Sequence, residues 1–357
     1  MPPPSTANIE AGKPRVETPS ATTNAPAQNP ILRPSRERVL LAFAAVYIIW
    51  GSTYLAIRIG VETIPPFFLA GIRFSIAGTL LYWWMRWHGV ASPSKAQWRA
   101  AGIVGALLFL GSNGALNWAE LRVPSGMASL LVSTVPLWMV LITHAQYKAR
   151  HGSARLGKRV IAGLAVGLAG VGLLIGPNDI LGHGGVDRIG AAALLFGSLA
   201  WTVGSIYSPK VGLPKSTMMA AAMEMICGGL LLILFGLVTS ESSGFEIAAI
   251  SRRSVAGLIY LITFGSLLGF TSYNWLLSHS TPARVSTYAY VNPVVAVFLG
   301  WAVAGETVTA RTLTAAALVV AAVILIITHR EHVPAPPADK SFSPAEEEEI
   351  PPLLPLD

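Results

Sequence analysis

Two segments of this chain resemble each other: NWAELRVPSGMASLLVSTVPL (117–137) and NWLLSHSTPARVSTYAYVNPV (274–294). Both begin with Asn-Trp and carry a matching serine and proline further on, at a constant offset of 157 residues without a gap. At an offset of 151 residues, Trp50 likewise matches Trp201. Matches of this kind between distant segments indicate an internal repeat.

The composition identifies the environment of this repeat. Hydrophobic residues make up 53% of the 357-residue chain and charged residues 12%, and the mean hydropathy is +0.57. A soluble domain carries roughly 25% charged residues, so we expect a polytopic membrane protein. Ten apolar spans of about 18–22 residues are each long enough to cross a hydrocarbon core. They lie near 38–57, 66–86, 100–119, 124–144, 159–176, 189–208, 217–239, 255–276, 282–303 and 311–329.

The order of the spans relates the two copies. Five spans separate matching positions, so the second copy must enter the membrane from the opposite side. The sequence therefore predicts an all-α fold of ten transmembrane helices, arranged as two inverted five-helix repeats over 37–176 and 187–329. A disordered N-terminal tail (1–36) and a disordered, acidic, Pro-rich C-terminal tail (330–357) are expected to flank them.

Basic residues predict the orientation in the membrane. The tails and connections on the N-terminal side hold 17 Lys and Arg, against 6 on the opposite side. By the positive-inside rule, both termini are expected in the cytoplasm. Because the basic residues flank apolar runs, the formal net charge of +7 does not indicate a nucleic-acid partner.

The sequence gives no sign of enzymatic chemistry. GSARLGKR (152–159) approaches a nucleotide-binding P-loop, but it ends in Arg where a Mg²⁺-binding hydroxyl is needed. The seven histidines show no metal-ligand spacing, and the single cysteine, Cys227, excludes a disulfide framework within the chain. We therefore expect no enzyme activity, no cofactor and no metal, and transport driven by a gradient.

Pro136 and Pro293 occupy matching positions inside the fourth and ninth spans. Each removes a backbone hydrogen bond and is expected to open its helix. Interrupted helices at matching positions of two halves point to a transport site, so we predict that both prolines act in gating. Plain kinks are the alternative.

Arg73 and Glu224 are charged residues inside spans, and the 151-residue offset places them at equivalent positions. An arginine at the bilayer centre costs at least about 2.5–3.5 kcal/mol. Each residue lies about eight positions, or ~12 Å, into its span, and the two would differ in depth by only ~7 Å. We predict an ion pair that is either a static clamp or opens during transport. Independent partners are the alternative.

Several motifs, in a fixed order, resemble one family. They read IIWGSTYLAIR (48–58), ETIPPFFLAGIRF (62–74), VPSGMASLL (123–131), STYAYVNPVVAVFLGW (286–301) and GETVT (305–309). Over residues 38–329 they resemble the EamA family of the drug/metabolite transporter superfamily. The resemblance implies a ten-helix permease of the inner membrane, with a central cavity lined mainly by spans 3, 4, 8 and 9 and by parts of spans 1 and 6. It also implies the export of amino acids, other metabolites or toxic compounds.

Aromatic, amide and acidic side chains are the candidate site residues. Aromatic faces can stack on rings or on a cationic amine, and amides orient polar groups. Proton exchange, which the sequence leaves open, would use Glu120 or Glu224. The predicted substrate-binding residues are Trp50, Asn117, Trp118, Glu120, Asn274, Tyr288 and Tyr290.

The expected partners are the lipid bilayer and a small solute, while a homodimer and protons are left open. Uptake by the same fold is one alternative to export. A lipid-handling membrane protein is an alternative from another class.

Overall fold

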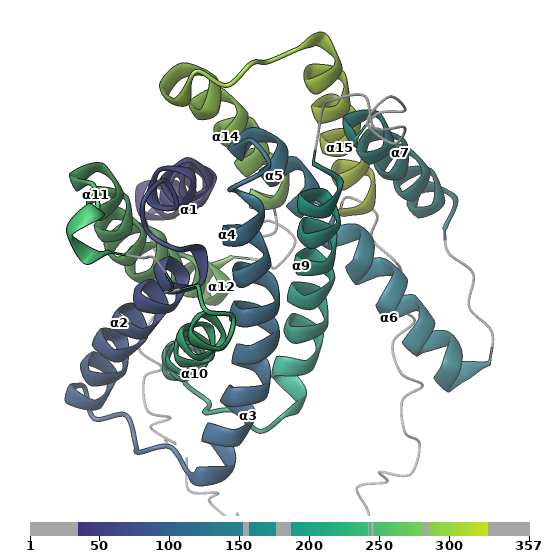
Figure 1. Ribbon diagram of the computed structural model, residues 1–357. Coiled ribbons are helices and arrows are strands. Elements are labelled where there is room, and N and C mark those ends of the chain that lie inside the picture. The colour runs from purple at the N-terminus through teal and green to yellow at the C-terminus, as the bar shows by residue number, and fades with distance from the viewer. Residues whose placement is uncertain are drawn as a thin grey trace, which may run out of the picture. The chain divides into compact units, whose positions relative to one another are not determined.

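The computed structural model describes residues 35–152, 157–175, 187–241, 243, 246–280, 285 and 287–327. Every regular element in these ranges is a helix (Figure 1). Both predicted tails lie outside them, apart from the two residues at the start of the described part. The predicted all-α class is therefore confirmed for the part of the chain that the structure describes.

The helices follow the ten expected spans in order. The first five spans are α1 (Arg36–Gly60), α2 (Pro66–Trp87), α3 (Lys95–Gly105) continued by η1 (Ala106–Gly114) and α4 (Ala115–Ala119), α5 (Ser125–Val132) with α6 (Val135–His151), and α7 (Lys158–Ile175). The second five are α9 (Arg188–Tyr207), α10 (Thr217–Val238), α11 (Arg252–Tyr260) continued by η4 (Leu261–Leu268) and α12 (Gly269–His279), α14 (Tyr288–Ala304), and α15 (Ala310–Ile327). Seven of these helical runs are long and apolar enough to cross a membrane, and two shorter apolar helices accompany them in the described part.

Polar side chains begin several of the helices. The Ser94 hydroxyl accepts from the Gln97 N–H at 3.2 Å, while the Gln97 side chain accepts from the Ser94 N–H at 2.8 Å. Asp187 and Ser216 cap α9 and α10 in the same way with one bond each. These bonds satisfy N–H groups that have no partner inside the helix, and so fix where each span begins.

Glycines bring α2 and α10 into close contact on a pseudo-two-fold axis. A Cβ at Gly78 would stand 2.8 Å from the Ala222 carbonyl oxygen, and one at Gly229 would stand 3.0 Å from the Gly71 carbonyl oxygen. Gly78 and Gly229 match at the 151-residue offset, and so do Gly71 and Ala222, so the two contacts are equivalent in the two repeats. Because the α2–α10 contact maps onto itself, the symmetry axis of the two repeats passes through it.

The remaining packing repeats in the same way. The α1 helix packs on α14, and its equivalent α9 packs on both α5 and α6. The fifth helices of the two repeats, α7 and α15, lie against each other (Figure 1). This pattern agrees with two repeats related by a pseudo-two-fold axis.

The third and eighth spans each contain a π-helical segment, which the sequence did not predict. These segments, η1 and η4, overlap when one is shifted by the 157-residue offset. A π-helical turn holds more residues than an α-helical turn and changes the direction of the side chains that follow, often at functional sites. Both repeats therefore carry the same local distortion.

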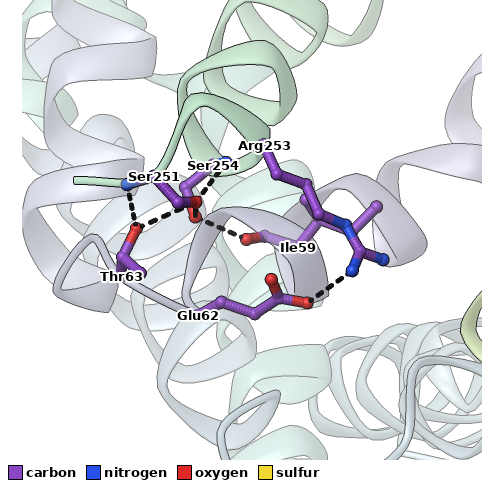
Figure 2. A network of polar contacts seen from close by, with 6 residues as sticks. All are labelled: Ile59, Glu62, Thr63, Ser251, Arg253 and Ser254. Carbon is purple, nitrogen blue, oxygen red and sulfur yellow. Dashed lines mark hydrogen bonds and ion pairs between the residues drawn. The ribbon is translucent and has the colours of Figure 1, made fainter.

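Polar contacts join the end of α1 in the first repeat to the start of α11 in the second (Figure 2). The Ser254 hydroxyl donates to the Ile59 carbonyl at 2.9 Å, and the Ser251 N–H donates to Thr63 Oγ1 at 3.0 Å. The residues drawn in the figure are Ile59, Glu62, Thr63, Ser251, Arg253 and Ser254. Arg253 and Glu62 add an exposed ion pair at 3.7 Å, of a kind that contributes about 0–1 kcal/mol.

Two carboxylates of the second repeat cap helices of the first. Glu306 accepts from the Ser125 N–H and hydroxyl, both at 2.7 Å, and from the Gly126 N–H at 3.1 Å, at the start of α5. Glu241 accepts from the Phe67 N–H at 3.1 Å, at the start of α2. A negative charge is favourable at a helix N-terminus. Burial raises the pKa of the Glu241 carboxyl, while its backbone hydrogen bonds lower it.

A fourth contact between the repeats is the ion pair of Arg122 and Asp187 at 3.6 Å. Successive connections in an antiparallel bundle alternate between its two ends. The connections after the first, third, fifth, seventh and ninth spans therefore share one end, and all four contacts belong to these connections. We call it the clamped end, defined by its acids Glu62, Asp187, Glu241 and Glu306.

Candidate functional site

A cavity of about 140 Å³ lies between the two repeats. Four of its lining residues come from α1: Trp50, Thr53, Tyr54 and Ile57. Their spacing of i, i+3, i+4 and i+7 places them on one face of that helix. This volume is below the 300–1,000 Å³ typical of drug-sized ligands, so the cavity suits a small solute.

The cavity lies where the symmetry of the repeats predicts a shared site. Trp50 and Trp201, which match at the 151-residue offset, both line it. So do Asn113 and Phe270, which match at the 157-residue offset. Because equivalent residues of both repeats reach the same cavity, it lies at the interface between them, as transport sites do in inverted-repeat proteins.

Aromatic rings form one wall of the cavity. The ring of Trp50 lies 5.1 Å from those of Tyr273 and Tyr288 and 5.5 Å from that of Phe270, between centroids. Its indole N–H donates to the Gly265 carbonyl at 3.3 Å. Edge-to-face and tilted contacts of this kind fix ring orientation, so Trp50 is held by the second repeat.

Polar groups complete the lining. Ser112 and Asn113 come from η1, Ser133 from the turn between α5 and α6, and Asn292 from α14. The Asn113 amide donates to the Leu108 carbonyl at 2.9 Å. The cavity thus combines an apolar aromatic wall with a few hydrogen-bonding groups, which is the usual composition of a ligand site.

Arg73 also lines the cavity and is only 4% exposed. Its Nε donates to the Ser266 hydroxyl of η4 at 2.9 Å, and its guanidinium carbon lies 4.5 Å from the centroid of the Phe74 ring. A hydroxyl and a ring face therefore contact the cation that the sequence places deep in a span.

The predicted ion pair of Arg73 with Glu224 is not among the ion pairs of the described residues, and this expectation is corrected. Glu224 instead accepts from the Ser208 hydroxyl at 3.1 Å. The reason is the direction of the side chains. The α2 helix meets α10 along the face of Gly71 and Gly78, and Arg73 lies on the other side of α2, toward η4.

Two of the seven predicted substrate-binding residues, Trp50 and Tyr288, line the cavity. Asn117 is fully buried, and its amide donates to the Asn113 carbonyl at 2.8 Å. The ring of Trp118 lies 4.6 Å from the guanidinium carbon of Arg122, away from the cavity lining. The Asn274 amide donates to the Phe270 carbonyl at 2.9 Å, and the side chain of Tyr290 lies outside the described residues.

Glu120 is the least solvated acid of the described part. It is fully buried, and neither carboxyl oxygen has a hydrogen-bond partner among the described residues. Arg58 donates to its backbone carbonyl instead. Glu120 follows the last residue of its span, and burial, with Glu306 nearby, raises its pKa well above the ordinary value, while Arg58 acts in the opposite direction. A buried carboxyl without a partner favours the protonated form.

The two prolines differ locally. Span 4 is divided into α5 and α6, and Pro136 is the second residue of α6 and lines the cavity. Pro293 lies inside α14, which continues through it. Matching positions therefore carry a helix break in one repeat and an uninterrupted helix in the other, and the gating role of both prolines remains a prediction.

Several lining residues are absent from the predicted set although the sequence carries a signal for them. Thr53 and Tyr54 follow Trp50 at helical spacing, and Trp201 is its repeat equivalent. Asn113 gave no such signal, because its direction depends on the π-helical segment that contains it. Within the described ranges, no group of three or more His, Cys, Asp or Glu residues could hold a metal ion.

Comparisons with known proteins complete the description of the site. The model of the EamA-like transporter family matches residues 38–176 and 188–328. The chain is 37% identical over 300 residues to the uncharacterized inner membrane transporter YedA of Escherichia coli K12, which covers 83% of this chain and 92% of that protein. It is 25% identical over 286 residues to a protein of Salmonella typhimurium named "Probable amino-acid metabolite efflux pump", over 78% and 91% of the two chains. A solved crystal structure matches with a TM-score of 0.54 at 20% identity, over 81% of this chain and 97% of that chain, which shows a common fold.

Proposed function

Because this chain belongs to the EamA-like transporter family and is a multi-pass transporter of the inner membrane, we propose that it exports a small metabolite or amino acid by alternating access. The cavity between the repeats is the substrate site in this proposal. One observation carries it: equivalent residues of the two repeats, Trp50 and Trp201, line the same cavity. A site at the repeat interface is the place where rocking of one repeat against the other changes access.

The lining supports a small amphipathic solute. The aromatic wall around Trp50 offers a surface for an apolar or cationic group, and Ser112, Asn113 and Ser133 offer hydrogen bonds to a polar group. Export rather than uptake is favoured by the name of the Salmonella typhimurium relative, which describes efflux of amino-acid metabolites.

Cells test the proposal directly. A deletion strain and an overexpressing strain are loaded with a panel of amino acids and toxic analogues, and growth and intracellular concentration are followed. Overexpression of an exporter raises resistance and lowers the intracellular concentration of its substrates. Accumulation of label from outside, without efflux from preloaded cells, would instead support uptake.

A matched pair of variants assigns the effect to the cavity. Trp50→Ala removes a lining ring, while Trp83→Ala removes a ring that is 66% exposed on α2. We expect the first variant to lose most efflux at normal membrane expression and the second to keep it. Equal efflux by both variants would contradict the assignment of the cavity as the substrate site.

We also propose that both termini lie in the cytoplasm, which would place the clamped end outside the inner membrane. The distribution of basic residues, 17 against 6, supports this orientation. Reporter fusions at both termini and cysteine labelling of the 147–159 connection test it. Labelling of that connection from outside intact cells would contradict it.

A further inference from the structure

Arg73 differs from every other residue that the structure places around the cavity. Among the described lining residues it is the one with a formal charge. Its Nε is engaged by Ser266, while its two terminal nitrogens donate to no group in the described part of the chain. The equivalent residue of the second repeat, Glu224, does not line the cavity, so the lining carries a single positive charge.

The surroundings of Arg73 accommodate the cation without neutralising it. A Cβ at Gly265 would stand 3.1 Å from Arg73 Nη2 and 3.0 Å from Thr53 Cγ2, so the absence of a side chain there makes room for the guanidinium group. The Ser266 hydroxyl and the Phe74 ring replace only part of the water that a buried arginine loses. Among the described residues no carboxylate forms an ion pair with this buried cation, so its charge costs stability.

We propose that Arg73 binds a carboxylate of the transported solute, and that Trp50 and Tyr288 hold its apolar remainder. This inference rests on the proposed function, because it takes the cavity as the substrate site. A guanidinium group presents its N–H donors in a planar fork that matches a carboxylate with two parallel hydrogen bonds. One positive charge in a small cavity matches one negative charge on the solute.

The position of the aromatic wall adds a second requirement. Trp50 packs on Tyr288 at 5.1 Å between ring centroids, and both line the cavity together with Arg73. The preferred solute therefore carries a carboxylate and a short apolar or aromatic side chain. A solute with the same side chain and no carboxylate meets the aromatic wall but leaves the arginine unpaired.

The first experiment measures the stability of purified protein without added solute. Arg73→Met keeps most of the side-chain length and removes the charge, so we expect its apparent Tm to equal or exceed that of the wild type. A purely structural arginine would give the opposite result, a clear drop in Tm. Arg58→Met is the matched control, because Arg58 donates to the Glu120 carbonyl at the clamped end, and we expect it to melt earlier.

The second experiment uses four probes that differ at the two polar groups: L-phenylalanine, 3-phenylpropionate, L-phenylalaninamide and 2-phenylethylamine. The same set is built on leucine for a smaller side chain. We expect the two carboxylates of a set to raise the Tm of the wild type and the amide and amine to leave it unchanged. In Arg73→Met the apparent affinity for the carboxylates should fall about ten- to hundredfold, as for the loss of hydrogen bonds to a charged partner.

Two results would overturn the assignment of Arg73. One is binding of the amide and amine as tight as that of the acids. The other is the absence, in both sets, of any carboxylate whose binding depends on Arg73. If the proposed function itself is wrong, the result differs. In that case overexpression of the wild-type protein changes the intracellular concentration of none of the solutes in the cell panel.

Discussion

Replacement of Glu306 by alanine should destabilise the protein through a single helix start. Its carboxylate accepts three hydrogen bonds, two from Ser125 and one from the Gly126 N–H, at 2.7, 2.7 and 3.1 Å. Ser125 is fully buried, so its donors would lose their acceptor with little access to water. At about 1–3 kcal/mol for each donor left without its charged partner, the three bonds give about 3 kcal/mol even at the lower end.

The matched control is the same substitution at Glu62. That carboxylate lies 3.7 Å from Arg253, and the two side chains are 42% and 57% exposed. Exposed ion pairs contribute about 0–1 kcal/mol. Both residues belong to the clamped end and both contact the other repeat, so the comparison isolates burial and the number of hydrogen bonds.

The assay is thermal unfolding in detergent, followed by the fluorescence of the 10 tryptophans. At roughly 2 °C for each kcal/mol in a chain of this size, Glu306→Ala should melt about 6 °C below the wild type and Glu62→Ala within about 2 °C of it. Glu306→Gln keeps an acceptor oxygen and should recover part of the loss. Equal shifts for the two alanine variants would refute the argument that Glu306 stabilises the start of α5.

Three further perturbations test other parts of the structure. The raised pKa of Glu120 means that the folded protein keeps a proton that the unfolded chain loses above the ordinary value of 4.5. Stability should therefore fall as the pH rises above that value, and Glu120→Gln should flatten that slope in a series of melting curves. Gly229→Ala, whose Cβ would stand 2.6 Å from the backbone of α2, should lower the free energy of unfolding by about 1–3 kcal/mol through overpacking. Gly172→Ala is the control, because a Cβ there has nothing within 4 Å, and it should be neutral or slightly stabilising. Equal melting temperatures of the two variants would contradict the close α2–α10 contact. Pro136→Ala and Pro293→Ala should each lower efflux more than membrane expression, and normal efflux kinetics in both would leave them as plain kinks.

The fold can be predicted from the sequence because it depends on hydropathy averaged over whole spans and on matches between distant segments. The apolar spans and the spacing of the repeated Asn-Trp and Pro residues do not depend on the conformation of single side chains, and a bilayer admits few alternatives to a helix. The start of α2 at Pro66 and the division of span 4 beside Pro136 also agree with residues whose backbone preferences are strong.

The site residues are harder to predict from the sequence than the fold, because the direction of a side chain depends on which face of its helix packs against which neighbouring helix. The sequence predicts similar depths for Arg73 and Glu224, but depth alone does not show that α2 and α10 meet through their glycine faces. The sequence predicts Asn117 as a site residue, whereas Asn113, in the π-helical segment, lines the cavity. The sequence does identify Trp50, an aromatic residue inside a span with a match at Trp201 in the second repeat, and both line the cavity.

If transport alternates access between the two ends, as proposed, the contacts of the clamped end make the free energies of the two end states unequal. If the repeats exchange conformations, the self-mapping α2–α10 contact is retained, whereas the carboxylate caps would have to be replaced by equivalents at the opposite end. The four connections there, 88–94, 152–157, 208–216 and 280–287, contain no Asp or Glu. These connections therefore offer no carboxylate that could take the place of Glu241 or Glu306 as a helix cap. In that mechanism the form with the clamped end closed is the more stable one without solute, and solute binding or new contacts at the opposite end offset the difference when it opens.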